Sequence, residues 1–133
     1  MEIENSLLEA AKKAREYAYC PYSGFKVGAA VLGKSGRIYT GCNIENVSYG
    51  LTNCAERTAI FKGISAGEKE FEILAVTADT KAPVAPCGAC RQVMAEFRIN
   101  RIIMSNMQGK RKQALLEELL PFSFDEEKLR QNK

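Results

Sequence analysis

The chain has 133 residues, of which 46% are apolar and 26% charged, so its composition is that of one globular domain rather than of a disordered or collagen-like chain. Nineteen basic and sixteen acidic residues leave a net charge of only +3, which argues against a nucleic-acid partner. The sequence contains no histidine, which excludes Ser-His-Asp and Cys-His catalysis and imidazole metal ligands. Acid–base chemistry near neutral pH must therefore use a carboxylate, a thiol, a lysine, a tyrosine or a metal-bound water.

Hydrophobic periodicity, capping residues and Gly or Pro breakers predict the elements along the chain. In chain order these are a helix from 6 to near 20, strands at 26–32 and 37–42, a helix at 54–62, a strand at 71–78, a helix at 88–97, a strand at 99–105 and a helix at 113–120. Ser6 begins a capping-box match, and Pro121 ends the last helix. The basic run 110–112 is expected to be a solvated turn. Helices that alternate with strands predict one mixed sheet covered on both faces, an α/β sandwich.

The N-terminus has neither a basic leader nor an apolar run, and no stretch approaches the roughly eighteen apolar residues that a membrane span needs. We therefore expect a cytoplasmic protein with no membrane partner. In a reducing cytosol, the five cysteines are thiols or metal ligands rather than a disulfide framework, and their odd number points the same way.

Two short segments carry the candidate chemistry, Cys54-Ala55-Glu56 and the run 86–90, Pro-Cys-Gly-Ala-Cys. Both are expected at helix N-termini, where the positive end of the helix dipole lowers the pKa of a thiol. Three thiolates that converge on two helix starts make a soft site suited to Zn²⁺, and three protein ligands leave one position open for water. Glu56 can act on that water only if the site lies off the N-terminal end of its helix.

The cysteine pattern leaves other interpretations open. Cys87 and Cys90 alone could form a redox pair, although this leaves Cys54 and Glu56 unexplained. A fourth cysteine, at 20 or 42, could complete a closed structural zinc site in a non-catalytic interaction module. Otherwise these two cysteines are expected to be small buried hydrophobic residues.

Several motifs follow one another over nearly the whole chain: FKVGAA at 25–30, GCNIEN at 41–46, CAERTA at 54–59, PCGACRQ at 86–92, and LLP at 119–121 followed by Phe124. Together they resemble the cytidine deaminases of the short, all-cysteine type, with Cys54 at the position of the histidine in the H-x-E signature. The resemblance implies a three-layer α/β/α sandwich with one mixed sheet of about five strands. It also implies that residues 1–133 form a single catalytic domain and that the protein is a homotetramer.

The resemblance further implies zinc-dependent hydrolytic deamination of cytidine and deoxycytidine to uridine and deoxyuridine, serving pyrimidine salvage. One Zn²⁺ per subunit would be held by Cys54, Cys87 and Cys90. Hydroxide supplied at the metal would attack C4 of the base, with Glu56 as proton shuttle. Arg57 would hydrogen-bond the thiolate sulfurs and offset their charge.

The substrate residues are also implied by the resemblance. Asn43 and Glu45 match residues that hold the ribose hydroxyls, and the backbone of Ala55 would contact the pyrimidine edge. Phe25 and Phe124 match aromatic residues that line the base pocket, with Phe124 reaching in from a neighbouring subunit. A modified nucleoside or an aminonucleoside antibiotic is an alternative substrate, but the segment 43–46 favours ribose recognition. A polynucleotide-editing enzyme is disfavoured, because the chain lacks an added basic surface.

Overall fold

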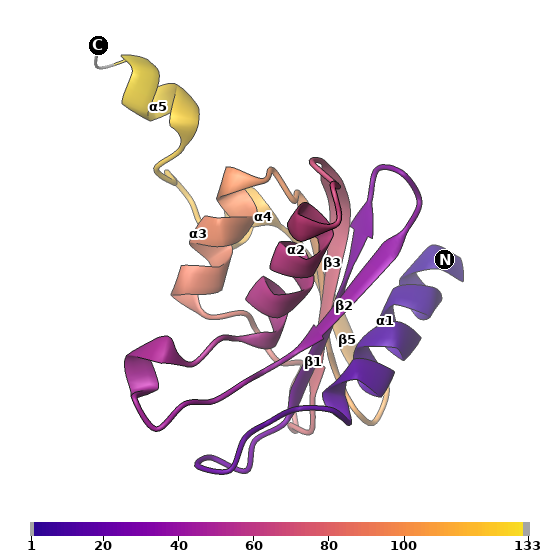
Figure 1. Ribbon diagram of the computed structural model, residues 1–133. Helices are drawn as coiled ribbons and strands as arrows, with labels where there is room; N and C mark the ends of the chain where they lie inside the picture. The colour runs from indigo at the N-terminus through magenta and orange to yellow at the C-terminus, as the bar shows by residue number, and fades with distance from the viewer. Residues whose placement is uncertain (1, 132–133) are drawn as a thin grey trace.

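Over residues 2–131, which the computed structural model describes, the chain forms one five-stranded sheet with helices packed on both of its faces (Figure 1). The strands are β1 (Val27–Gly33), β2 (Ile38–Cys42), β3 (Phe71–Ala78), β4 (Arg101–Asn106) and β5 (Arg111–Leu115). They lie in the order β2-β1-β3-β4-β5, in which the β3–β4 pair is parallel and the other three pairs are antiparallel. The mixed sheet between two helical layers confirms the expected α/β/α sandwich.

The long helices divide between the two faces of the sheet. Helix α1 (Glu2–Arg15) covers one face, and helices α2 (Ala55–Ser65) and α3 (Gly88–Glu96) cover the other (Figure 1). The short helices are η1 (Tyr49–Leu51), α4 (Leu116–Leu119) and α5 (Glu126–Gln131), and α5 projects away from the sheet. Within residues 2–131, no helix has the length and apolar character needed to span a bilayer.

Both faces of the central strands are buried, because successive side chains of a strand point to opposite faces. On β3, Ile73 and Ala75 pack with residues of α1, whereas Leu74 and Val76 pack with residues of α2 and α3. A strand buried on both faces has a nearly continuous apolar sequence rather than an alternating one. This explains why the apolar run 71–78 was predictable as a strand with the bounds that the structure gives.

Gly41 of β2 allows helix α2 to lie very close to the sheet. A Cβ atom at this position would lie 2.4 Å from the backbone nitrogen of Ala59 and 2.6 Å from the carbonyl oxygen of Ala55. Backbone atoms of a helix cannot move aside singly, so any side chain here would displace the first turns of α2. The glycine therefore helps to set the position of Cys54, the residue that caps this helix.

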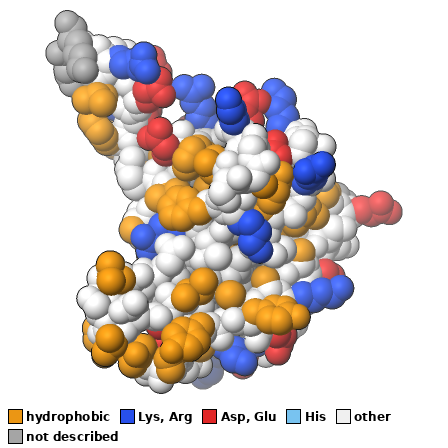
Figure 2. Space-filling view, viewed as in Figure 1, with side chains coloured by type: hydrophobic (Ala, Val, Ile, Leu, Met, Phe, Trp, Pro, Cys, Tyr) orange, Lys and Arg blue, Asp and Glu red, His pale blue; other side chains and the backbone are white. Residues whose placement is uncertain are grey.

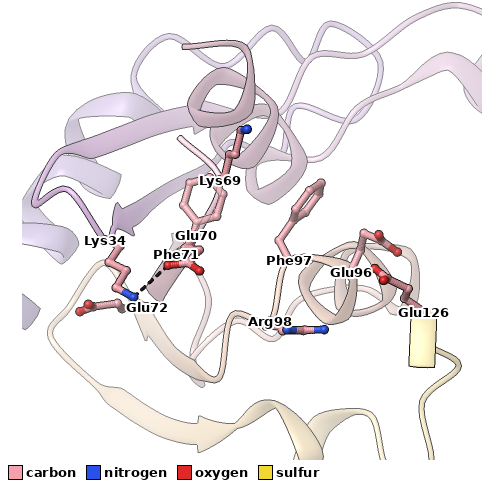
Figure 3. A pocket seen from close by; sticks show the side chains of 9 residues that line it. All are labelled: Lys34, Lys69, Glu70, Phe71, Glu72, Glu96, Phe97, Arg98 and Glu126. Atoms are coloured by element: carbon pink, nitrogen blue, oxygen red, sulfur yellow. Dashed lines mark ion pairs between the residues drawn. The ribbon is translucent and has the colours of Figure 1, made fainter. Parts of the chain in front are cut away.

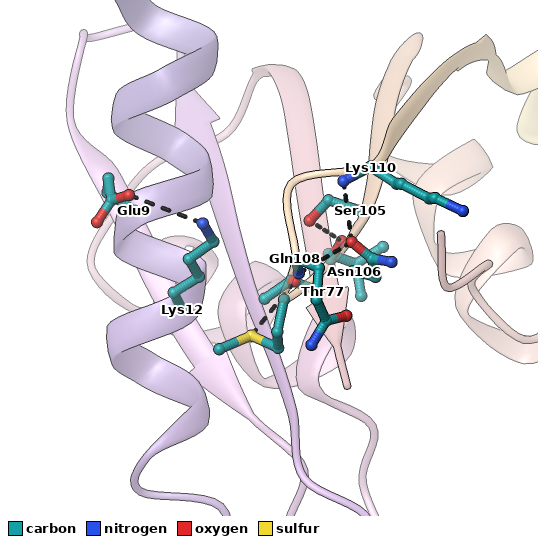
Figure 4. A network of polar contacts seen from close by, with 9 residues as sticks. Glu9, Lys12, Thr77, Ser105, Asn106, Gln108 and Lys110 are labelled. Atoms are coloured by element: carbon teal, nitrogen blue, oxygen red, sulfur yellow. Dashed lines mark hydrogen bonds and ion pairs between the residues drawn. The ribbon is translucent and has the colours of Figure 1, made fainter. Parts of the chain in front are cut away.

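A polar network around Asn106 joins the end of β4 to the loop before α3 (Figure 4). The Asn106 side chain is buried, and its Oδ1 accepts hydrogen bonds from the backbone N–H groups of Gln108 and Lys110 at 3.0 and 2.9 Å. Its Nδ2 donates to the carbonyl oxygen of Lys81 at 2.9 Å. One side chain thus closes the β4–β5 turn and holds the loop that leads to Cys87.

The first helix differs from its prediction at both ends. It begins at Glu2, so Ser6 lies inside the helix rather than at its cap, and it ends at Arg15. Acidic residues in its first turn and basic residues in its last turn complement the helix dipole, and this pattern marks the ends better than the capping-box match. Beyond the helix, Tyr19 forms a parallel bridge with Ile44, so sheet-like pairing replaces the predicted last helical turn.

The predicted helix at 113–120 is wrong over its first half. Residues up to Leu115 belong to β5, which pairs with β4, and α4 keeps only residues 116–119. Backbone pairing along the sheet edge outweighs the helix propensity of this segment. The side chains of Lys110, Arg111 and Lys112 are exposed as expected, but the last two residues are part of this edge strand rather than of a turn. Charged side chains on an edge strand discourage pairing with other chains.

Candidate active site

Three cysteine side chains meet where helices α2 and α3 begin. Cys54 caps α2, Cys87 caps α3, and Cys90 lies in the first turn of α3. The Sγ atoms of Cys54 and Cys87 are 3.7 Å apart, those of Cys87 and Cys90 are 3.4 Å apart, and all three lie within 4.8 Å of one another. Residues 33 positions apart in sequence are thus brought together by the packing of the two helices on the same face of the sheet.

The donor set fits zinc. With Zn–S bonds of about 2.3 Å and tetrahedral angles, two sulfur ligands lie about 3.8 Å apart, close to the separations seen here. Hydrogen bonding with the Cys90 thiol lowers the pKa of Cys54 to about 5, with a further contribution from Arg57. The same contact, together with burial, raises the pKa of Cys90. The cluster therefore favours a thiolate at Cys54 before any metal is considered, and thiolates are the form that binds zinc.

Arg57 lies beside the thiols, one helical turn after Cys54. Its Nη2 donates to the Sγ of Cys54 at 3.3 Å, and this hydrogen bond raises the pKa of the Arg57 guanidinium. Its Nε is buried and has no hydrogen-bond partner among the described residues. A guanidinium in this position can offset the negative charge of the sulfur ligands, as the sequence predicts.

Glu56 is a buried carboxyl group, with 4% of its surface exposed. It lies in the first turn of α2, two residues after Cys54, and it lines the same cavity as Cys54 and Cys87. The cavity thus lies off the N-terminal end of α2. In this position Glu56, two residues after Cys54, can act at the same site as the thiol. Burial raises the pKa of Glu56 to about 7, with a further contribution from the charge of Cys54. A carboxyl group with this pKa can accept and release protons near neutral pH.

The cavity in front of the thiols has a volume of about 270 Å³. Besides the two cysteines and Glu56, the predicted substrate residues Phe25, Asn43, Glu45 and Ala55 all line it. Sequence reasoning missed further lining residues, which are Ser23, Val27, Thr52, Val76, Val84 and Ala85. The valines and Ala85 have apolar side chains that carry no recognisable chemistry, so the sequence gives no reason to place them at a site. Only their position in the fold brings them to the cavity.

Asn43 and Glu45 hold the chain segments that form the cavity wall. The Oδ1 of Asn43 accepts from the backbone N–H of Val27 at 2.9 Å, and its Nδ2 donates to the carbonyl oxygen of Phe25 at 2.8 Å. Glu45 accepts hydrogen bonds from the backbone N–H groups of Tyr22 and Ser23 and from the Ser23 hydroxyl. The Ser23 hydroxyl contributes most to a lowered pKa of Glu45, so this residue presents an ionised carboxylate to the cavity.

Three residues considered in the sequence analysis, Cys20, Cys42 and Phe124, lie outside both this cavity and the thiol cluster. Cys20 and Cys42 are half-buried free thiols, and neither belongs to the cluster of three. Phe124 is 59% exposed, and its carbonyl oxygen accepts a hydrogen bond from Gln92. Since Phe124 was expected in the pocket of a neighbouring subunit, its role stays a prediction.

A larger hollow of about 650 Å³ lies elsewhere and contains none of the predicted site residues (Figure 3). Both acidic and basic side chains line it, among them Lys34, Glu70 and Arg98, together with the rings of Phe71 and Phe97. Lys34 and Glu70 form an ion pair, so their charges already neutralise each other. The convergence of thiols and a buried carboxyl group, rather than volume, marks the smaller cavity as the candidate active site.

Comparisons with known proteins identify relatives of this chain. A family model for the "cytidine and deoxycytidylate deaminase zinc-binding region" matches residues 1–106. A cytidine deaminase of Sporosarcina psychrophila is 53% identical over 131 residues, which cover 97% of this chain and 96% of that protein. One of Halalkalibacterium halodurans is 54% identical over 123 residues, which cover 91% of this chain and 93% of that protein.

A solved structure has the same fold at a similar level of identity. The crystal structure of cytidine deaminase from Burkholderia pseudomallei matches with a TM-score of 0.87 and 51% identity, covering 90% of this chain and 98% of that one. These matches in sequence and fold extend over nearly the whole chain, as the motifs indicated. The chain therefore belongs to the cytidine and deoxycytidylate deaminase family.

Proposed function

We propose that this protein catalyses the hydrolytic deamination of cytidine and deoxycytidine to uridine and deoxyuridine, with release of ammonia. The observation that carries this proposal is the buried carboxyl group of Glu56 in the same cavity as the thiols of Cys54 and Cys87. In zinc-dependent nucleobase deaminases, attack of water on C4 uses a metal ion and a group that carries protons. Here the thiols would hold the metal, and the Glu56 carboxyl group would carry the protons. The curated relatives named above are cytidine deaminases, which supports the choice of substrate.

In this mechanism Cys54, Cys87 and Cys90 would hold the metal, and Arg57 would offset part of the thiolate charge. Zinc, when bound, supplies the Lewis acidity that allows a water molecule to lose its proton near neutral pH. The Glu56 carboxylate takes that proton and passes it to N3 of the ring, which makes C4 more electrophilic. After the water oxygen has bonded to C4, Glu56 would take the remaining proton from that oxygen and deliver it to the amino group. The C4–N bond then breaks, the C4 carbonyl forms, and ammonia leaves.

The charge of the cavity favours a nucleoside over a nucleotide. Among the described residues that line it, none is a lysine or arginine, whereas Glu45 and Glu56 are both acidic. A phosphate group would therefore meet carboxylates and thiolates without a cation to pair with, which is costly in a partly enclosed site. The carboxylate of Glu45 can instead accept hydrogen bonds from sugar hydroxyls, with Asn43 beside it, as the family resemblance implies.

The decisive experiment compares the wild type with Glu56→Gln. We expect the wild type to convert cytidine to uridine, followed by the change in ultraviolet absorbance. The variant should lose turnover by about 10²- to 10⁴-fold, because an amide of the same shape cannot carry the proton. Metal analysis of both proteins is the control, and the variant should retain its zinc.

Two outcomes would contradict the proposal. Undiminished turnover in Glu56→Gln would remove this residue from the mechanism. A wild-type protein that binds zinc but leaves cytidine and deoxycytidine unchanged would exclude the proposed substrates and favour a modified nucleoside or a non-catalytic zinc module.

We also propose that the active protein is a homotetramer in which Phe124 reaches the cavity of a neighbouring subunit. Apolar side chains gather over the loop between β2 and α2, where Val47, Tyr49 and Leu51 are more than 70% exposed (Figure 2). Large exposed apolar patches are typical of interaction surfaces. Sedimentation equilibrium should give four times the chain mass, and a monomer with full activity would contradict this part of the proposal.

The remaining expectations concern the setting of the reaction. We propose a cytoplasmic enzyme of pyrimidine salvage that acts on free nucleosides, with neither a nucleic-acid nor a membrane partner. The five cysteines are free thiols, which suits a reducing compartment. Cell fractionation followed by an assay for cytidine deamination tests the location, and activity confined to the membrane fraction would contradict it.

A further inference from the structure

Arg91, on helix α3, hydrogen-bonds to two segments of the chain that lie far apart in the sequence. Its Nε donates to the carbonyl oxygen of Pro86 at 2.9 Å, and its Nη1 donates to the carbonyl oxygen of Leu119 at 2.7 Å. The Arg91 side chain is half-buried, so water competes only partly for these hydrogen bonds. Bonds from a charged guanidinium to carbonyl groups are stronger than those between neutral groups.

The first of these bonds acts directly beside a metal-binding position. Pro86 precedes Cys87, so a hydrogen bond to the Pro86 carbonyl fixes the peptide plane that joins the two residues. Of the three thiols, Cys90 is buried and Cys54 is half-buried, whereas Cys87 is exposed. Surrounding side chains therefore do little to hold Cys87 in place, and its position depends on its backbone.

The second bond reaches the C-terminal part of the described chain. Leu119 ends the single turn of α4, and its side chain packs at the edge of the core formed with α2 and α3. The next residue of α3, Gln92, donates from Nε2 to the carbonyl oxygen of Phe124 at 2.7 Å. Two adjacent side chains of α3 thus hold the segment 119–124, but only Arg91 also reaches the loop before Cys87.

We propose that Arg91 is a positioning residue that fixes Cys87 through the Pro86 carbonyl and anchors this loop to Leu119, and that it thereby slows the loss of zinc. This inference rests on the assignment of the three thiols as the zinc site. A guanidinium suits this task because its rigid fork can donate to two carbonyl groups at once. A lysine ammonium is a point charge that can satisfy only one of them well.

The test measures the rate at which zinc leaves the protein for a colorimetric chelator present in excess. We expect Arg91→Gln to release zinc about 10-fold faster than the wild type, because partners around metal ligands typically change metal affinity by this amount or more. Arg91→Lys should fall between the two. Gln92→Ala, the matched control, removes a bond to the same C-terminal segment but leaves the Pro86 bond, and its release rate should stay within about twofold of the wild type.

A second measurement separates positioning from general loss of stability. The metal-free forms of the wild type and Arg91→Lys are unfolded by urea, and we expect a difference too small to account for faster zinc release. Equal release rates for the wild type, Arg91→Lys and Arg91→Gln would overturn the inference, and so would an equal acceleration in Gln92→Ala. If Arg91→Gln does not fold, the comparison of Arg91→Lys with Gln92→Ala decides the question. A wild type that retains no zinc would instead contradict the zinc site itself.

Discussion

Glu45 is a cavity residue whose carboxylate is held in one orientation by its neighbours. It accepts hydrogen bonds from the backbone N–H groups of Tyr22 and Ser23 at 3.0 and 3.1 Å and from the Ser23 hydroxyl. These bonds lower the pKa of Glu45 and fix the direction of its carboxylate at the cavity. An orientation that exists before the substrate arrives reduces the entropy that binding must overcome.

This arrangement predicts a change in substrate binding rather than in chemistry. Under the proposed function, Glu45→Gln removes the charge that would accept hydrogen bonds from the sugar hydroxyls, and hydrogen bonds to charged groups contribute about 1.5–3 kcal/mol. We expect the KM for cytidine to rise by about 10- to 100-fold while kcat changes little. Steady-state kinetics with 2′,3′-dideoxycytidine, which lacks both hydroxyls, provide the control. An equal rise in KM for this analogue would show that Glu45 does not bind the sugar hydroxyls.

At the scale of elements, helix α2 depends on a close contact with strand β2. The space above Gly41 is filled by backbone atoms of α2, at 2.4 Å from Ala59 and 2.6 Å from Ala55 for a hypothetical Cβ. The same helix presents Cys54, Glu56 and Arg57. Packing at this glycine therefore contributes to the geometry of the site as well as to stability.

Gly41→Ala is expected to destabilise the protein by about 1–3 kcal/mol, because the added methyl group forces α2 away from the sheet. Gly50→Ala is the matched control: no atom lies within 4 Å of a Cβ at this position, and its backbone is not left-handed. Urea unfolding of both variants measures the difference. A Gly41→Ala variant as stable as Gly50→Ala would show that α2 can shift without any loss in the free energy of unfolding.

The turn between β1 and β2 is tied to the loop after α2 by Glu68. This carboxylate accepts from the N–H and hydroxyl of Ser35 at 3.2 and 2.5 Å and from the Tyr39 hydroxyl at 3.0 Å. Hydrogen bonding from Ser35 contributes most to lowering the pKa of Glu68 below its ordinary value of 4.5. A carboxyl group whose pKa falls on folding stabilises the folded state above the unfolded pKa, and this stabilisation is lost as the pH falls through the folded pKa.

Glu68→Gln should therefore destabilise the protein at pH 7 and have a smaller effect in acid. We expect the difference in urea midpoint between wild type and variant to be largest above about pH 5 and to shrink as the pH falls below 4.5. Taking the difference between the two proteins cancels the effect of acid on groups they share, including the thiols. A difference that is constant from pH 7 to pH 3.5 would refute the role of this charge.

At the scale of the whole molecule, the candidate metal site joins segments that lie far apart in the sequence. Cys54 follows the loop after β2, whereas Cys87 and Cys90 follow the loop after β3. A metal that binds all three thiols in the folded state but not in the unfolded state stabilises the entire fold. Zinc should therefore affect global unfolding and not merely activity.

Removal of zinc is expected to lower the thermal midpoint by about 10 °C. At a free zinc concentration one hundred times the Kd, binding contributes about 2.7 kcal/mol, and for a domain of this size about 1 kcal/mol corresponds to roughly 4 °C. Calorimetry before and after chelation, and after zinc is restored, measures this change. Cys20→Ala should show the same response to zinc as the wild type, because Cys20 lies outside the cluster. An unchanged midpoint after complete metal removal would contradict the coupling.

The sequence by itself determined the features that depend on local pattern. The apolar run 71–78 indicated a buried strand, and the segments at 54 and 87 indicated helix starts, because short-range periodicity and capping carry this information. The residue types and spacing of the three cysteines with Glu56 indicated a catalytic zinc site, since no histidine was available for the role.

Only the tertiary structure decided what depends on distant contacts. The meeting of the three sulfur atoms and the burial that raises the pKa of Glu56 follow from the packing of α2 and α3 on one sheet face. Pairing with β4 made a strand of residues predicted to be helical, and the bonds of Arg91 join carbonyl groups that carry no signal in the sequence. Local propensities are weak compared with the free energy of burial and of sheet pairing, so contacts between distant residues settle these points.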